Sequence, residues 1–136
     1  MTEQEKQLLL SDLCARLPYG VKYCRDSWNY EWDQEMSVVE VLEDIDKEGY
    51  INYHKVYKVD DIKPYLRPMS SITEEEIKEY NTAIDKDTIE INKTFETPSA
   101  CMVGLNALDW LNAHHFDYRG LIPMGLALEA PEGMYK

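Results

Sequence analysis

Hydrophobic residues at the start of the chain recur with the period of a helix. The repeating apolar positions are Leu9, Leu13 and Leu17, with Leu10 and Cys14 beside them. Thr2, followed three residues later by Glu5, has the form of a capping box, and Pro18 cannot continue a helix. The pattern predicts a helix over residues 2–17.

From residue 21 the hydrophobic period changes to two, which is typical of strands. The alternating positions are Val21 and Tyr23, then Trp28, Tyr30 and Trp32, and the apolar run continues through Val38, Val39, Val41 and Leu42. An acidic turn at residues 44–49 separates this run from a second aromatic and β-branched group, Ile51, Tyr53, Tyr57 and Val59. These residues predict a small antiparallel sheet with a hairpin around residues 44–49.

The C-terminal half begins after two prolines, which make residues 63–68 the best internal boundary. Thr73 is the predicted N-cap of a helix, and Glu76 completes its capping box. A short strand is predicted where apolar residues alternate with polar ones, at Ile89, Ile91 and Phe95. A last helix is predicted over residues 105–114, and Asp117 is expected to cap a further turn through Ile122.

The order of these elements predicts an α+β protein. It consists of an N-terminal helix, a small antiparallel sheet, and a C-terminal part with two helices and a short strand. Curling of the sheet towards a barrel is an alternative. At 136 residues the chain has the size of one compact domain, with residues 1–68 and 69–136 as a possible subdivision.

The net charge restricts the classes of partner. Twenty-six acidic and fourteen basic residues give a formal net charge of −12, which repels phosphate backbones and argues against direct nucleic-acid binding. A basic protein partner fits this charge better. No apolar run approaches the ~20 residues of a membrane span, and the N-terminus is acidic where a secretory signal is basic, so we expect a cytoplasmic protein without a membrane partner.

Residues 44–52 (DIDKEGYIN) match the first nine positions of an EF-hand calcium loop. The twelfth position, where a bidentate glutamate closes the calcium cage, is Lys55. An ammonium group has no lone pair for a cation. We therefore predict a turn and no metal site here, and the sequence predicts no cofactor elsewhere.

The densest group of reactive side chains follows the last predicted helix: His114, His115, Asp117 and Arg119. Adjacent histidines cannot share one helical face, so a zinc site would need further ligands. Cys101 would need one of these histidines as its base, and no nucleophile motif frames it. We expect capping, packing and ion-pair roles for the cluster, and we predict no catalytic residue.

Aromatic residues alternate with polar ones at Trp28, Tyr30 and Trp32. One face of this segment must be aromatic. Packing in the core is one interpretation; the other is an exposed surface of aromatic anchors with a polar rim, as found in protein interfaces.

Three blocks of the sequence carry a resemblance to a family. They are CARLPYG at residues 14–20, KPYLRPMSSITEEE at residues 63–76 and HHFDYRGLIPMGLALEAPEGMYK at residues 114–136. Together they resemble a family of small proteins, with no assigned activity, from anaerobic gut bacteria and their prophages or mobile elements. The resemblance implies an intracellular setting and a mobile-element role, and it supplies no cofactor or catalytic residue.

Three functional hypotheses follow. The first is a noncatalytic protein-interaction module of bacterial or mobile-element origin that uses the Trp28, Tyr30 and Trp32 region. The second is an acidic DNA mimic that occupies a nucleic-acid-binding protein, and it requires carboxylates arranged in rows. The third is a small enzyme that uses the His114 to Asp117 region.

Overall fold

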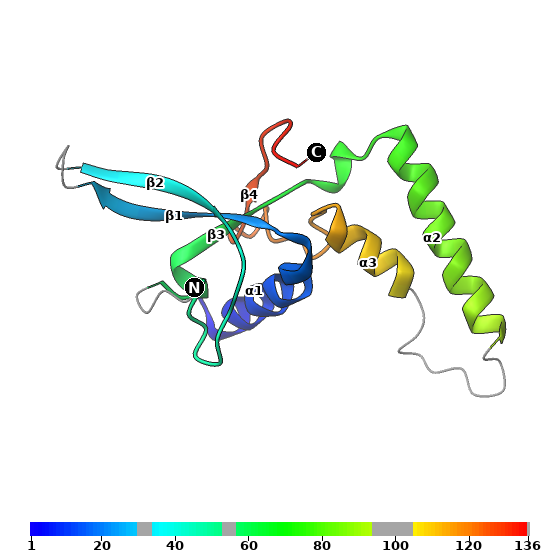
Figure 1. Ribbon diagram of the computed structural model, residues 1–136, viewed down its shortest axis with the longest axis horizontal. Helices are drawn as coiled ribbons and strands as arrows, with labels where there is room; N and C mark the ends of the chain where they lie inside the picture. Colours follow the sequence, from blue (N-terminus) through cyan, green and yellow to red (C-terminus); the bar gives the residue numbers. More distant parts are fainter. Residues whose placement is uncertain (30–33, 53–56, 94–104, 136) are drawn as a thin grey trace.

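The computed structural model describes residues 1–29, 34–52, 57–93 and 105–135. Its architecture is α+β, as the sequence predicts. Figure 1 shows a central sheet crossed by the N-terminal helix, with a long two-stranded hairpin extending to one side and a pair of helices extending to the other.

The N-terminal helix α1 spans Glu3–Arg16 and has the predicted start. The Glu5 backbone N–H donates to the Thr2 hydroxyl at 3.1 Å, and the Thr2 backbone N–H donates to the Glu5 carboxylate at 2.9 Å. Two orphan donors are thereby satisfied. A short 3₁₀ turn over Leu17–Tyr19 follows, and Gly20 then takes a left-handed conformation that reverses the chain.

The sheet is open and has the strand order β2-β1-β3-β4 in the part of the chain that the structure describes. Its strands are β1 (Lys22–Asn29), β2 (Gln34–Val41), β3 (Ile62–Leu66) and β4 (Leu128–Glu129). β1 pairs antiparallel with β2 over its full length, but with β3 over only three residues. The short β4 pairs parallel with β3. The sheet is not closed, so the barrel-like alternative is wrong.

The turn predicted around residues 44–49 forms, with the Asp46 N–H donating to the Tyr50 carbonyl at 3.0 Å, but it does not connect the two long strands of the sheet. β2 pairs with β1, so the connection of the main hairpin lies between Asn29 and Gln34. The described residues of the returning segment form isolated antiparallel bridges, of Ile45 with Ile51 and of Tyr50 with Lys58. A 3₁₀ turn over Val59–Asp61 leads into β3.

Helix α2 spans Glu74–Lys93, and α3 spans Leu105–Ala113. A 3₁₀ turn over Met69–Ser71 precedes α2, whose predicted capping box forms between Thr73 and Glu76 at 3.1 and 3.2 Å. The strand predicted at Ile89 and Ile91 is wrong, because both lie within α2, and Phe95 falls outside the described residues. The short strand of the C-terminal half is β4.

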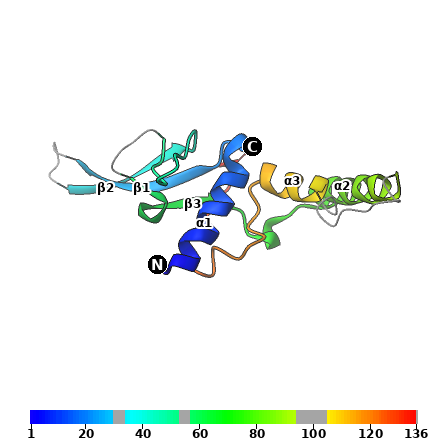
Figure 2. The ribbon, with the colours of Figure 1, turned by 90° about the horizontal axis from the view of Figure 1, so that it is seen from below.

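The hydrophobic core lies between α1 and one face of the sheet (Figure 2). From α1, Leu9 and Leu13 are fully buried against alternate residues of β1 and β3, including Tyr23 and Ile62. Loop residues complete the core: Leu42, Ile51, Val59, Leu121, Leu126 and Ala127. None of the helices described in the structure is long and apolar enough to cross a bilayer.

Candidate functional site

The cluster predicted after the last helix begins where α3 ends. His115 has a φ of 62°, in the left-handed region that a residue other than glycine, asparagine or aspartate seldom adopts. The backbone of Arg67 holds this bend. Its N–H donates to the His115 carbonyl at 2.7 Å, and its carbonyl accepts from the Asp117 N–H at 2.8 Å.

Asp117 has the capping role that its position in the sequence predicts. Its two carboxylate oxygens accept from the backbone N–H groups of Leu121 at 2.8 Å and Ile122 at 2.9 Å. Both oxygens are therefore occupied by backbone donors. This carboxylate shapes the loop after α3 and is not placed to act as a base.

Arg119 pairs with a carboxylate, as expected, and its partner is Asp12 of α1 at 2.7 Å. Asp12 also receives two hydrogen bonds from Arg16, at 2.8 and 3.1 Å. Asp12 and Arg16 are both fully buried, and Arg16 donates further to the carbonyl of Phe116. This buried ion pair of Asp12 and Arg16 was not predicted from the sequence. Its signal was two opposite charges four residues apart within the apolar stripe of α1.

His114 and His115 point to different surroundings. His114 stacks on Trp110 with 4.0 Å between ring centroids, and its Nδ1 donates to the Trp110 carbonyl at 2.9 Å. His115 is only 6% exposed and stacks on Tyr135 with a centroid distance of 3.8 Å. The buried Nδ1 of His115 has no hydrogen-bond partner among the described residues.

The pKa of His115 is lowered to about 4. Burial is the main cause, because it removes the charged form from water. Four nearby groups that can carry positive charge add to the effect, in the order Arg16, His114, Arg67 and Lys22. His115 is therefore a neutral imidazole within a positive field at neutral pH.

Tyr135 connects the C-terminal segment to the sheet. Its hydroxyl accepts from the Lys22 backbone N–H at 2.8 Å and donates to the Tyr65 carbonyl at 2.7 Å. Burial raises the pKa of this phenol to about 12, so it remains a donor at neutral pH. The ring covers His115 on one side, and the ammonium of Lys22 lies 5.9 Å from its centroid.

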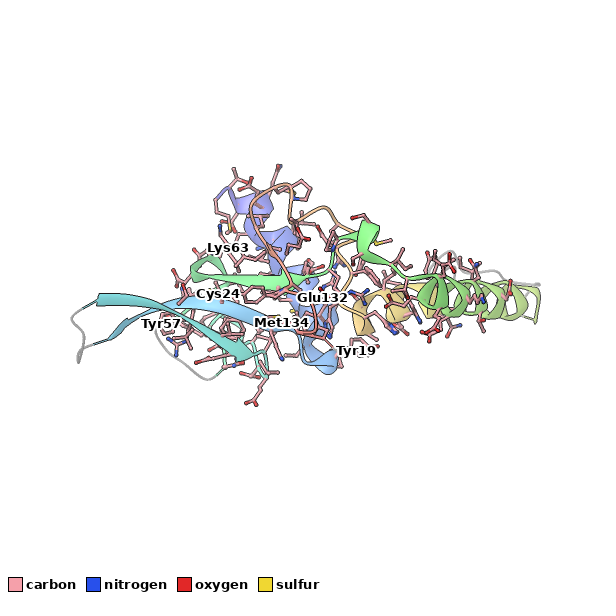
Figure 3. The ribbon with its side chains drawn as sticks, turned by 90° about the horizontal axis from the view of Figure 1, so that it is seen from above. Tyr19, Cys24, Tyr57, Lys63, Glu132 and Met134 are labelled. Carbon is pink, nitrogen blue, oxygen red and sulfur yellow. The ribbon has the colours of Figure 1, made fainter. Side chains whose placement is uncertain are left out.

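These residues border a pocket of about 460 Å³ between the sheet and the end of α3. Figure 3 shows Tyr19 and Met134, two residues of its wall, near each other in the middle of the molecule. The polar side chains on the wall are those of Lys22, Arg67, His114 and His115. Asp117 and Arg119 are not part of the wall. The predicted cluster therefore divides into two residues with structural hydrogen bonds and two histidines that line a pocket.

No serine, threonine or cysteine accompanies the two histidines on the pocket wall as the structure describes it. Of the cysteines, Cys14 is exposed and Cys24 is partly buried on β1, while Cys101 falls outside the described residues. The alternative of an enzyme built on His114 to Asp117 therefore gains no catalytic arrangement from the described side chains.

The segment that resembles a calcium loop forms a turn held by its own backbone. The Asp46 carboxylate accepts from the N–H groups of Glu48 at 3.0 Å and Tyr50 at 2.9 Å, and Gly49 adopts a φ of 88°. Lys55 falls outside the described residues. Within those residues, no group of three or more potential metal ligands is found.

The aromatic candidates lie at the far end of the main hairpin. Trp28 belongs to β1, whereas Tyr30 and Trp32 fall outside the described residues. The exposed acidic residues lie on separate elements, with Glu74, Glu75 and Glu79 on α2 and Glu43, Asp46 and Glu48 in the loop after β2. The DNA-mimic hypothesis stays a prediction.

Comparison of the chain with models of known families, with curated proteins and with solved structures gives no match.

Proposed function

We propose that the protein is a noncatalytic interaction module that binds an extended segment of a partner protein along the outer edge of β2. The observation that carries this proposal is the position of β2 in the sheet. It is an eight-residue edge strand of the sheet, and no further strand pairs with its outer edge in the described part of the chain.

The register identifies which backbone groups are available on that edge. The Leu42 N–H donates to the Val21 carbonyl. The backbone N–H and C=O groups of even-numbered residues in β2 therefore point towards β1, and those of odd-numbered residues point away from it. At the end near the core, the Asn52 amide donates to the outward Val41 carbonyl at 2.7 Å and closes the edge. Beyond this closed end, the next residue whose backbone groups point outwards is Val39.

The sequence of β2 supports a binding role for this edge. Proteins usually protect exposed edge strands with lysine, proline or a bulge. β2 reads QEMSVVEV, contains neither lysine nor proline, and pairs with β1 without a bulge. Val39 and Val41 are 48% and 41% exposed on the same face. Such an edge suits strand addition, in which backbone hydrogen bonds supply affinity and side chains supply specificity.

The charges near this edge favour a basic partner. The loop directly after β2 carries the exposed residues Glu43, Asp46 and Glu48. An extended segment with lysine or arginine would be attracted to this end of the hairpin. The bacterial or mobile-element origin of the module rests on the family resemblance alone.

The test is capture of partners from a native lysate with the whole chain as bait. Val39→Pro removes an outward N–H while leaving the β1–β2 hydrogen bonds in place, because residue 39 faces away from β1. Val39→Thr keeps both the N–H and the branched side chain. We expect the proline variant to lose at least about 90% of a specifically captured protein, which is a tenfold effect, and the threonine variant to retain it.

Circular dichroism of the two variants checks that the hairpin still folds. Equal capture by wild type and Val39→Pro, or no protein captured specifically by the wild type, would refute strand addition at this edge. Synthetic peptides from the captured protein then identify its binding segment, which should be extended and basic.

A further inference from the structure

The pocket beside His115 concentrates positive charge in a strongly acidic protein. Lys22 has no carboxylate within ion-pair distance among the described residues, and its ammonium touches only the Met134 carbonyl, at 3.2 Å, and the Tyr135 ring. Two of its three N–H donors remain available. Arg67 borders the pocket too, but its guanidinium is held by Glu76 at 2.6 and 2.8 Å.

Near the pocket, the ion pairs around Asp12 join two arginines, Arg16 and Arg119, to one carboxylate. Arg16 is fully buried, and its Nη1 has no hydrogen-bond partner among the described residues. Negative groups near His115 would raise the pKa of its ring, whereas positive groups lower it. The lowered pKa therefore agrees with a net positive charge around the ring.

His115 is built into this wall at a cost to the backbone. It adopts a left-handed conformation, its ring is nine-tenths buried, and one of its nitrogens has no partner. Strained residues with unsatisfied polar atoms occur preferentially at binding sites. A neutral imidazole offers one N–H, which complements the charged donors of Lys22.

We propose that this pocket binds the oxyanion group of a small molecule, a carboxylate or a phosphate, between Lys22 and His115. The apolar wall at Tyr19, Ala113 and Met134 would accommodate the body of that molecule. A volume of about 460 Å³ lies within the range of small-ligand pockets.

Two hollows on the neighbouring surface are lined by carboxylates and do not favour an anion. A hollow on the α3 side is lined by Glu79 and Asp109, and one on the α2 side is lined by Glu75, Glu129 and Glu132. Both repel an anion. The attraction is thus confined to the few ångströms around Lys22, which favours a compact ligand over an extended polyanion.

The test uses the full chain, labelled for NMR, at neutral pH and constant ionic strength. Sodium benzoate and inorganic phosphate are titrated separately, and the His115 ring signals and the Gly20 and Met134 amides are followed. We expect saturable shifts with at least one of them below a concentration on the order of 10 mM. Saturation by benzoate identifies a carboxylate site, and saturation by phosphate identifies a phosphate site.

Three variants locate the binding. Lys22→Met removes the free ammonium but keeps the backbone N–H that Tyr135 uses, and it should weaken binding at least about tenfold. Lys63→Met is the matched control, because Lys63 is exposed on the same open face of the sheet but outside the pocket. It should weaken binding by less than about twofold. His115→Asn tolerates the left-handed backbone and should also weaken binding, as followed by the amides of Gly20 and Met134.

Two outcomes would overturn the proposal. One is the absence of saturable shifts with both anions. The other is an equal loss of affinity in Lys22→Met and Lys63→Met, which would show that the anion responds only to the overall charge. Neither outcome bears on strand addition at β2, whose test does not involve the pocket.

Discussion

At the scale of single residues, the structure contains a buried ion pair between Asp12 and Arg16. Asp12 and Arg16 lie on the buried stripe of α1, one turn apart, where two apolar residues would be expected. Removing both charges from water costs free energy, which the close ion pair and the hydrogen bond to Phe116 offset. The same carboxylate also anchors Arg119, so one residue of α1 fixes the loop after α3.

Replacing Asp12 alone should lower the free energy of unfolding far more than replacing both Asp12 and Arg16 with apolar residues. We expect Asp12→Ala to lower the free energy of unfolding by about 3–5 kcal/mol, because Arg16 is then a buried charge without a partner. The double variant Asp12→Leu with Arg16→Met should recover most of that loss. Urea unfolding of the three proteins measures the difference, and a double variant no more stable than Asp12→Ala would contradict this account.

At the scale of elements, capping signals in the sequence were reliable because they depend only on neighbouring residues. Thr2 with Glu5 and Thr73 with Glu76 each start a helix as predicted. The strand predicted at Ile89 and Ile91 was wrong for a reason visible in the sequence. Ile77, Ile84 and Ile91 are spaced by seven residues, a helical repeat, and this longer pattern prevails over the local alternation.

Strand pairing was harder to predict than helix starts. The segment from Trp28 to Trp32 alternates like one continuous strand and contains no glycine or proline to signal a turn. The turn signal of Asp46 and Gly49 was correct, because a turn with an antiparallel bridge of Ile45 with Ile51 forms there, but the longer pairing of β1 with β2 was not predicted. The pocket was likewise unpredictable, because Lys22, Arg67 and His115 are brought together only by the tertiary fold.

The contact of Tyr135 with two strands gives a test at this scale. Tyr135→Phe leaves the Lys22 N–H and the Tyr65 carbonyl without their partner, so we expect a loss of about 1–3 kcal/mol in the free energy of unfolding. Tyr19→Phe is the control, since Tyr19 lies on the same pocket wall but is 38% exposed. Chemical denaturation of wild type and both variants measures the loss. If Tyr135→Phe were as stable as Tyr19→Phe, the Tyr135 hydroxyl would contribute nothing to stability.

At the scale of the whole molecule, the burial of His115, together with the positive groups near it, makes stability depend on pH. Its pKa is about 4 in the folded protein, whereas an unfolded histidine titrates near 6.5. Between these values the unfolded chain binds more protons, so the free energy of unfolding falls as the pH is lowered from about 6.5 to about 4.

The size of this effect can be isolated with a variant. Wild type and His115→Asn share all their carboxylates, so the difference between their stability curves reports on the histidine. Between neutral pH and pH ~4, the free energy of unfolding of the wild type should fall by up to about 3 kcal/mol more than that of the variant. Denaturant titrations at several pH values measure this difference, and parallel curves for the two proteins would contradict it.

The phenol of Tyr135 has a geometric consequence for the sheet. A direct backbone bond between Lys22 and Tyr65 would span about 2.9 Å, whereas the inserted oxygen places contacts of 2.8 and 2.7 Å in series. The two strands must diverge at this point. The inserted hydroxyl thereby ends the ladder between β1 and β3 on the side of Tyr23 and Pro64, and it comes from a residue more than a hundred positions away from Lys22.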